Sequence, residues 1–343
     1  PIPHPHAHAR IWEVRARQPD QSGSAASDRR SCDRGAVEDR GWERESIESV
    51  GIGLNIHVID GTYELFRQFY GRKRFAKGGD VSNGAVIGVL NSVLEMIDDG
   101  ATHIGVATDH VIESFRNQLY DGYKTGDGID PELWAQFHPL EEALVAMGVV
   151  TWPMVEYEAD DGMATAARIA EEDERVERIS LWTPDKDLAQ CVRGDRVVQV
   201  DRRNKEIRDA AGVRKKFGVE PELIPDFLAL VGDAADGFPG IPRIGKVTAG
   251  QLLNEHGPIE NFPDDILGAH AADAALFKEL ATLKTDADAL GRSPLFKNVD
   301  ALEWRGPTPD FLAWTSQLKD PGLAKRAGET AARSVDRLGS TPA

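Results

Sequence analysis

The stretch Tyr157-Glu158-Ala159-Asp160-Asp161 places three carboxylates within four positions. It lies between an apolar run (149–155) and a segment that is typical of a helix (162–170). Neighbouring like charges raise one another's pKa or destabilise the fold, so the cluster needs an explanation. Acidic residues in a first helical turn cap free N–H groups and suit the helix dipole, which is a sufficient account of these five residues alone. A binding function requires that other carboxylates converge on the same place.

Apolar, strand-like runs alternate with helical segments from Leu54 onward. Strands are expected at 54–59, 102–107, 149–152, 176–182 and 197–200, and the longer helices between them at 83–97, 131–147 and 161–172. This alternation is typical of a mostly parallel sheet whose two faces are covered by helices. The expected fold class is therefore α/β.

Acidic residues recur at the carboxyl ends of the expected strands. They are Asp60, Asp109, Asp185 and, two positions later, Asp187, together with the triplet Glu158, Asp160 and Asp161. One such Asp is common as a turn former. Ligand sites of parallel sheets lie beyond the carboxyl ends of the strands, so this many acids at one edge predicts a cage for Mg²⁺ or Mn²⁺. Zinc is disfavoured at these positions, because His110 is the only histidine beside them.

The chain changes character after about residue 205. Helices are expected at 209–217, 221–231 and 246–256, and the segment 232–245 between the last two is rich in glycine and proline. A turn of this kind exposes backbone N–H groups, and the following helix start adds its positive end, a combination that binds phosphate. The pattern predicts a helix–hairpin–helix that contacts the DNA backbone rather than its bases. An ordinary helical hairpin is the alternative, and the doubled pattern Gly240-Ile241 and Ile244-Gly245 argues against it.

Composition limits the classes of protein. The 343 residues are 41% hydrophobic, which is enough for two domains with cores of their own. The net charge of −17 argues against a protein that coats nucleic acid nonspecifically, but not against an enzyme with a metal centre. The two cysteines, Cys32 and Cys191, suggest neither a disulfide framework nor a zinc site, and the expected location is cytoplasmic. No apolar run has transmembrane length, so no membrane contact is expected.

Several motifs in this order resemble the 5′ nuclease family, which includes the 5′-nuclease domain of bacterial DNA polymerase I and free-standing exonucleases and flap endonucleases. They are Val58-Ile59-Asp60-Gly61, Tyr157–Asp161, Thr183-Pro184-Asp185-Lys186-Asp187-Leu188 and the segment 232–245. The resemblance covers about residues 54–284. It implies a PIN-like α/β nuclease domain followed by a helical helix–hairpin–helix (H3TH) region, and the free-standing type, because no polymerase domain fits after residue 284.

Four parts are expected along the chain. Residues 1–50, which begin with a Pro/His alternation, read as a disordered extension in which His4, His6 and His8 are solvated. Residues 51–205 should form the nuclease domain, beginning near Leu54, and residues 206–290 the H3TH region. Residues 291–343 are expected to form C-terminal helical packing that frays past Arg326.

The resemblance also implies roles for individual residues. The metal ligands would be Asp60, Asp109, Glu158, Asp160, Asp161, Asp185, Asp187, Asp233 and Asp236, which would hold two ions, Mg²⁺ or Mn²⁺. Arg116 and Lys124 would contact the scissile phosphate, and Tyr123 would either stack on a base or pack within its loop. Further DNA contacts are expected from Gly240, Ile241, Arg243, Gly245, Lys246 and Thr248, and K⁺ is a candidate cation at the hairpin turn. The chain departs from the family at 125–128, where Thr-Gly-Asp-Gly makes the arch less cationic.

The expected function is a metal-dependent 5′-3′ exonuclease and structure-specific flap endonuclease that acts in DNA replication and repair. Its partner would be DNA with 5′ ends, flaps or junctions, bound by a monomer without an obligate protein partner. A PIN-type metal-dependent ribonuclease is one alternative, although it would not need the helix–hairpin–helix. A noncatalytic DNA-junction binder is another, and the complete set of carboxylates argues against it. A haloacid-dehalogenase-like phosphatase is rejected, because Val58 stands where its nucleophile should be.

Overall fold

The computed structural model describes residues 53–73, 83–317 and 320–339. The predicted N-terminal extension, including His4, His6 and His8, lies outside these residues. The first strand begins at Leu54, which is where the folded part was expected to begin. No helix in the described part of the chain combines the length and apolar character needed to cross a membrane.

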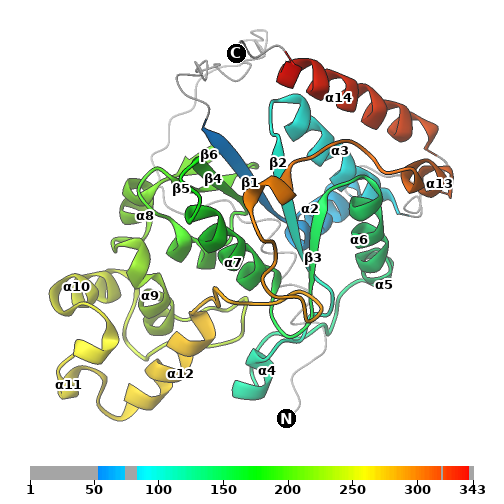
Figure 1. Cartoon of the computed structure of the whole chain (residues 1–343). Helices are drawn as coiled ribbons and strands as arrows, with labels where there is room; N and C mark the ends of the chain where they lie inside the picture. The colour runs from blue at the N-terminus through cyan, green and yellow to red at the C-terminus, as the bar shows by residue number, and fades with distance from the viewer. Residues whose placement is uncertain (1–52, 74–82, 318–319, 340–343) are drawn as a thin grey trace, which may run out of the picture.

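A six-stranded sheet forms the centre of the nuclease-like part (Figure 1). Its order is β3-β2-β1-β4-β5-β6, with the first five strands parallel and β6 antiparallel to β5. The strands are β1 (Leu54–Asp60), β2 (His103–Asp109), β3 (Val150–Met154), β4 (Val176–Trp182), β5 (Val197–Asp201) and β6 (Glu206–Arg208). The predicted mostly parallel sheet is confirmed. The short β6 was missed, because two of its three residues are exposed and it shows no apolar pattern.

Helices cover both faces of the sheet, and neighbouring residues of β1 point to opposite cores. Ile59 packs under α2 (Gly61–Lys73), α3 (Gly84–Asp98) and α6 (Phe137–Ala146), whereas Val58 packs under α7 (Ala159–Glu171). Chain order reverses at β1, since β2 lies on one side of it and β4 on the other. A ligand site is therefore expected where β1 and its neighbours end.

The expected helix 131–147 is two helices, α5 (Pro131–Trp134) and α6. Between them, the side-chain oxygen of Gln136 accepts hydrogen bonds from the backbone nitrogens of Ala85 (3.0 Å) and Val86 (3.3 Å). These are free N–H groups in the first turn of α3, whose own N-cap residue makes no side-chain cap. The break between α5 and α6 thus allows Gln136 to cap α3, which is distant in sequence. A local sequence pattern contains no sign of this contact.

The second part of the chain is helical and has a separate core. Its helices are α8 (Ala210–Phe217), α9 (Ile224–Val231), α10 (Lys246–His256), α11 (Asp264–Leu267) and α12 (Ala271–Ala281). Helix α12 packs on α9, and the 232–245 segment joins α9 to α10. The short α4 (Arg116–Leu119) contacts α12, which ties the loop after β2 to this part.

The chain ends with α13 (Asp310–Gln317) and α14 (Pro321–Gly339), which lies against α3. The expected fraying past Arg326 is wrong, because Thr330 and Ser334 are buried and Arg333 donates a 2.7 Å hydrogen bond to Asp98. After Leu323, the buried residues of α14, as far as its side chains are described, are Ala327, Thr330 and Ser334, so the later turns of this helix carry little apolar signal.

Candidate metal centre

The structure gathers the strand-end carboxylates at one edge of the sheet. One oxygen each of Asp160, Asp185 and Asp187 lies within 4.8 Å of the others, and the same holds for Asp187, Asp233 and Asp236. Asp187 belongs to both groups, so acids from the nuclease-like part and from the hairpin form one continuous cluster. The predicted convergence of these five side chains is therefore seen in the geometry.

Asp60 and Asp109 adjoin this cluster at the ends of β1 and β2. Asp60 accepts hydrogen bonds from the backbone nitrogen of Tyr63 (2.8 Å) and from Thr183 Oγ1 (3.1 Å). Asp109 accepts one from the backbone nitrogen of Ala159 at 2.8 Å. Each Asp therefore links the end of its strand to the start of a helix, and these hydrogen bonds fix the strands and helices relative to one another at this edge of the sheet.

Burial and mutual repulsion disturb the ionisation of these acids. Burial raises the pKa of Asp60 to about 7 and that of Asp109 to about 6. Burial, followed by the charge of neighbouring carboxylates, raises the pKa of Asp160 and Asp187 well above the ordinary range. The ionised forms of these carboxyls repel one another, and a bound cation would offset that repulsion.

The donor set fits a hard divalent cation. The cluster offers only carboxylate oxygens, the ligands that Mg²⁺ and Mn²⁺ prefer. Asp187 Oδ1 is buried and has no hydrogen-bond partner in the described part of the chain. A buried carboxylate oxygen without a partner is costly, so this atom indicates a place for a cation.

Two lysines border the cluster. The Lys124 ammonium lies 2.5 Å from Glu158 Oε2 and 3.1 Å from Asp236 Oδ1, and Lys186 Nζ lies 2.7 Å from Asp233 Oδ2. Burial alone would raise the pKa of Glu158, but Lys124 and then Arg116 bring it below the ordinary value. Glu158 is thereby kept ionised. Lys186 was not singled out from the sequence, although its place between Asp185 and Asp187 was the available signal.

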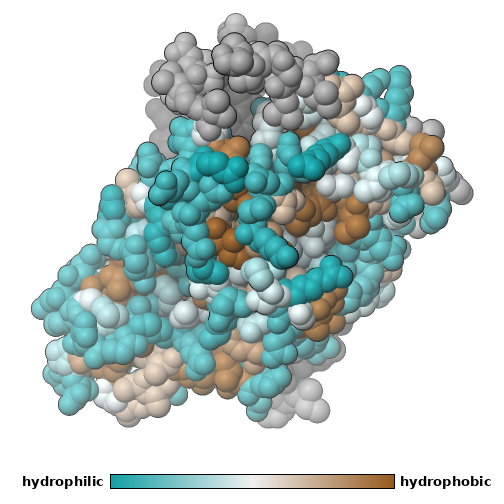
Figure 2. All heavy atoms as spheres, in the orientation of Figure 1, coloured by the Kyte–Doolittle hydropathy of each residue, from teal (hydrophilic) through white to brown (hydrophobic). Residues whose placement is uncertain are grey.

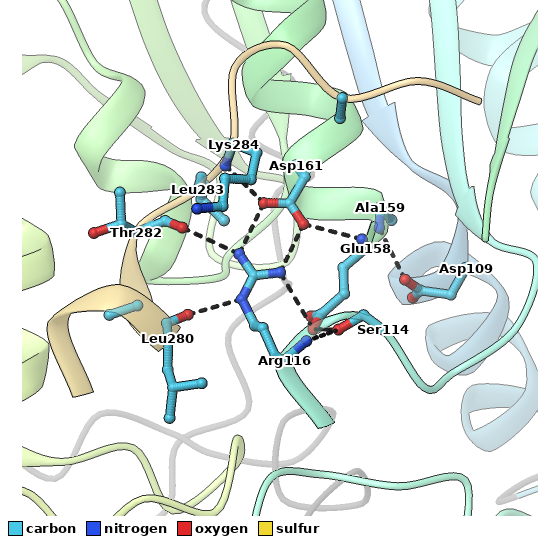
Figure 3. A network of polar contacts seen from close by, with 12 residues as sticks. Asp109, Ser114, Arg116, Glu158, Ala159, Asp161, Leu280, Thr282, Leu283 and Lys284 are labelled. Atoms are coloured by element: carbon cyan, nitrogen blue, oxygen red, sulfur yellow. Dashed lines mark hydrogen bonds and ion pairs between the residues drawn. The ribbon is translucent and has the colours of Figure 1, made fainter. Parts of the chain in front are cut away.

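Arg116 lies inside the protein rather than at an open surface, and Figure 3 shows its guanidinium between Asp161 and the carbonyl groups of Leu280 and Thr282. Its guanidinium donates to both oxygens of Asp161, at 2.6 and 2.8 Å, and to the carbonyl oxygens of Leu280 (2.8 Å) and Thr282 (3.2 Å). Only 1% of its surface is exposed. The expected contact with the scissile phosphate does not fit this position, because the donors of Arg116 are already used.

Asp161 requires the matching correction. It is fully buried, and its oxygens also accept from the backbone nitrogens of Glu158 (3.0 Å) and Lys284 (2.8 Å). Its lone pairs are therefore engaged away from the acidic cluster, and the expected role as a metal ligand does not fit. Figure 3 shows Glu158 beside this network, where Ser114 Oγ donates to Glu158 Oε1 at 2.8 Å. No sequence pattern indicated Ser114.

Tyr123 follows the packing alternative. Its ring is 3% exposed and belongs to the core of the helical part, together with Phe238. The backbone nitrogen of Lys124 donates to Asp236 O at 3.1 Å, which joins this loop to the hairpin. A buried ring in this position supports the loop that carries Lys124 and presents no exposed face for stacking on a base.

The predicted DNA-binding residues fall into two groups. Gly240 and Ile241 are buried and shape the hairpin. Gly240 has φ +74°, and a Cβ there would lie 2.3 Å from the backbone nitrogen of Gly232. The second group is exposed at the start of α10 and before it, and consists of Arg243, Gly245, Lys246 and Thr248.

Comparison with known proteins agrees with this architecture. Two family models match the chain, the N-terminal resolvase-like domain of 5′-3′ exonucleases over residues 55–218 and their C-terminal SAM fold over residues 219–309. The 5′-3′ exonuclease of Aquifex aeolicus is 31% identical over 242 residues, which are 68% of this chain and 83% of that protein. DNA polymerase I of Bacillus subtilis is 30% identical over 294 residues, 81% of this chain. The chain spans 32% of that relative's length.

Solved structures share the fold at low identity. Flap endonuclease-1 from Methanococcus jannaschii has a TM-score of 0.54 at 15% identity, covering 83% of this chain and 94% of that one. A complex of the bacteriophage T5 flap endonuclease with DNA and metal ions has a TM-score of 0.53 at 15% identity, covering 82% and 99%. The family expected from the motifs is confirmed by the family models and the sequence relatives, and the chain belongs to the 5′-3′ exonuclease family.

Proposed function

We propose that the chain hydrolyses DNA phosphodiester bonds near 5′ ends, flaps and single-strand/duplex junctions, with two divalent cations, Mg²⁺ or Mn²⁺. The observation that carries the proposal is the continuous carboxylate cluster, in which Asp187 is shared between two groups of potential ligands. Family membership supports the same reaction, because relatives are named 5′-3′ exonuclease.

The proposed metal ligands come from the acidic cluster and from the adjoining strand ends. Asp160, Asp185, Asp187, Asp233 and Asp236 would hold the ions, with Asp60 and Asp109 at the adjoining strand ends. When bound, such ions activate water and stabilise the leaving oxygen of a phosphodiester. Because the lone pairs of Asp161 are engaged elsewhere, that residue is outside the proposed ligand set, whereas Glu158, which Lys124 and Arg116 keep ionised, remains in it.

Positive charge beside the cluster would act on the phosphate. Lys124 is anchored between Glu158 and Asp236, with its backbone bonded to Asp236 as well. An ammonium fixed in this way can stabilise charge that develops on a phosphate without moving to meet it. Arg116 would act indirectly, by bracing α4 and the loop that leads to Lys124.

Duplex DNA would be held by the exposed start of α10. Helix α10 begins after Gly245, and Lys246 and Thr248 are exposed in its first turn. Helix starts of this kind bind phosphate, and contacts to the backbone position DNA without reading its bases. At the hairpin turn the proposal includes K⁺, a cation that backbone carbonyls coordinate.

A cleavage assay on a 5′-labelled flap in Mn²⁺ tests the proposal. Asp187→Asn removes the charge at the shared ligand while keeping its shape, and it relieves repulsion in the metal-free protein, so the variant should fold. We expect its rate to fall about 10²-fold or more, the scale of losing one group that stabilises transition-state charge. The matched control is Asp265→Asn, at an exposed position of α11, which should keep the wild-type rate. Equal cleavage by Asp187→Asn and wild type would overturn the proposal.

A further inference from the structure

A third group of potential ligands lies outside the carboxylate cluster. One ligand atom each of His110, His138 and Glu141 lies within 4.8 Å of the others. His110 directly follows β2, whereas His138 and Glu141 stand three residues apart on α6. Residues at this spacing share one face of a helix, and paired Glu and His at i, i+3 are a known arrangement of metal ligands.

The distances suit a small tetrahedral ion. His110 Nδ1 lies 2.8 Å from Glu141 Oε2, and His138 Nδ1 lies 3.9 Å from the same oxygen. Ligand atoms around tetrahedral Zn²⁺ are roughly 3.3 Å apart, given metal–ligand distances of about 2.0–2.2 Å. The two observed separations lie on either side of that value, so the two imidazoles would have to rotate to enclose an ion.

The surroundings hold the ligands in orientation. Thr108 Oγ1 donates a 2.8 Å hydrogen bond to Glu141 Oε1, which leaves Oε2 turned toward the histidines. The backbone nitrogen of His110 donates to Met154 O at 2.9 Å and so fixes the base of that side chain on β3. Hydrogen bonds of this kind, from residues behind the ligands, are typical of metal sites. The imidazoles themselves are accessible, with His110 and His138 side chains 28% and 55% exposed.

We propose that His110, His138 and Glu141 form a separate site for Zn²⁺ or a similar transition metal, with solvent as the fourth ligand. Two imidazoles and one carboxylate select such ions over Mg²⁺, which requires an oxygen octahedron. A bound ion would join the end of β2, next to Asp109, to α6. The site uses none of the carboxylates proposed for hydrolysis, so it stands independently of the proposed function.

Titration of the full chain with Co²⁺, followed by displacement with Zn²⁺, tests this site. His4, His6 and His8 are replaced by Ala in every protein compared, because a histidine-rich tail binds these ions as well. Millimolar Mg²⁺ is included to fill the carboxylate cluster. We expect one equivalent of Co²⁺ with the strong visible absorption of tetrahedral coordination, and its loss when Zn²⁺ is added.

His138→Ala should abolish the absorption and weaken Zn²⁺ binding at least about tenfold. Because the His138 ring is exposed, this variant should fold as the wild type does, which its melting curve checks. Thr108→Val should weaken Zn²⁺ binding by about 10–100-fold through loss of the hydrogen bond to Glu141. The matched control is His270→Ala, because His270 and Asp273 also form a His/acid pair at i, i+3, at 3.2 Å. That control should bind as the wild type does. Unchanged binding in His138→Ala, or no tetrahedral absorption in the wild type, would overturn the proposal and leave His110 and Glu141 as a hydrogen-bonded pair only.

Discussion

Replacing Arg116 by Met distinguishes two roles of this residue. A structural role inside the fold predicts a loss of stability, whereas a contact with the phosphate predicts a loss of DNA cleavage at unchanged stability. Arg116 and Asp161 are 1% and 0% exposed and share two hydrogen bonds. Removing one partner of a buried ion pair costs about 3–5 kcal/mol, because the other charge stays buried without compensation. Two backbone N–H groups still bond to Asp161 in the variant, so we expect a loss near the lower end, about 3 kcal/mol.

Urea denaturation of the single and double variants measures this loss. In Arg116→Met/Asp161→Asn the unpaired charge is absent. The loss of unfolding free energy in this double variant should therefore be smaller than the sum of the two single losses, by about 1–3 kcal/mol. Arg168→Met is the control, because its partner Glu172 is exposed and the pair should contribute less than about 1 kcal/mol. If Arg116→Met kept wild-type stability but lost DNA cleavage while folded, a brace could not explain it, and a direct contact with DNA would be favoured.

Two further predictions concern the acidic cluster and α10. Burial raises the pKa of Asp60 to about 7, so the folded state binds this proton more tightly than the unfolded state. In metal-free buffer the wild type should therefore lose stability relative to Asp60→Asn as the pH rises from about 5 to 8, which a series of Tm measurements would show. A constant difference in Tm between the two proteins over this range would mean that Asp60 is ionised throughout and would contradict the prediction. The comparison cancels buried His57, whose pKa is lowered to about 4 and which acts in the opposite direction. Lys246→Ala should weaken duplex binding and reduce the salt slope by about 1, with Mn²⁺ affinity unchanged. Lys325→Ala, at an exposed position of α14, serves as the control, and an unchanged salt slope in Lys246→Ala would exclude this lysine from the DNA contact.

The position of the acidic cluster could be predicted from the sequence because it depends only on the strands being parallel. Parallel strands bring their carboxyl ends to one edge, so Asp60, Asp109 and Asp185 had to approach one another. The different contacts of Asp160 and Asp161 could not be predicted in this way. The two residues are adjacent and of the same type, yet the rotation of about 100° between successive helical residues directs Asp160 to the cluster and Asp161 to Arg116.

Partners distant in sequence decide the remaining differences. The guanidinium of Arg116 is fixed by Leu280 O, 164 positions away, and no local pattern contains that contact. Gln136 ends a predicted helix because it caps α3, about fifty positions earlier in the chain. On α14, Thr330 and Ser334 pack inside although neither residue counts as apolar in a periodicity argument. Long-range hydrogen bonds and small buried side chains are thus the features that the sequence left undetermined.

Diffraction from crystals soaked in Mn²⁺, recorded at the manganese absorption edge, tests the metal centre most directly. We expect anomalous peaks among the oxygens of Asp160, Asp185, Asp187, Asp233 and Asp236, and none between Arg116 and Asp161. A map without a peak in the acidic cluster, from crystals in which those side chains are well ordered, would contradict this expectation.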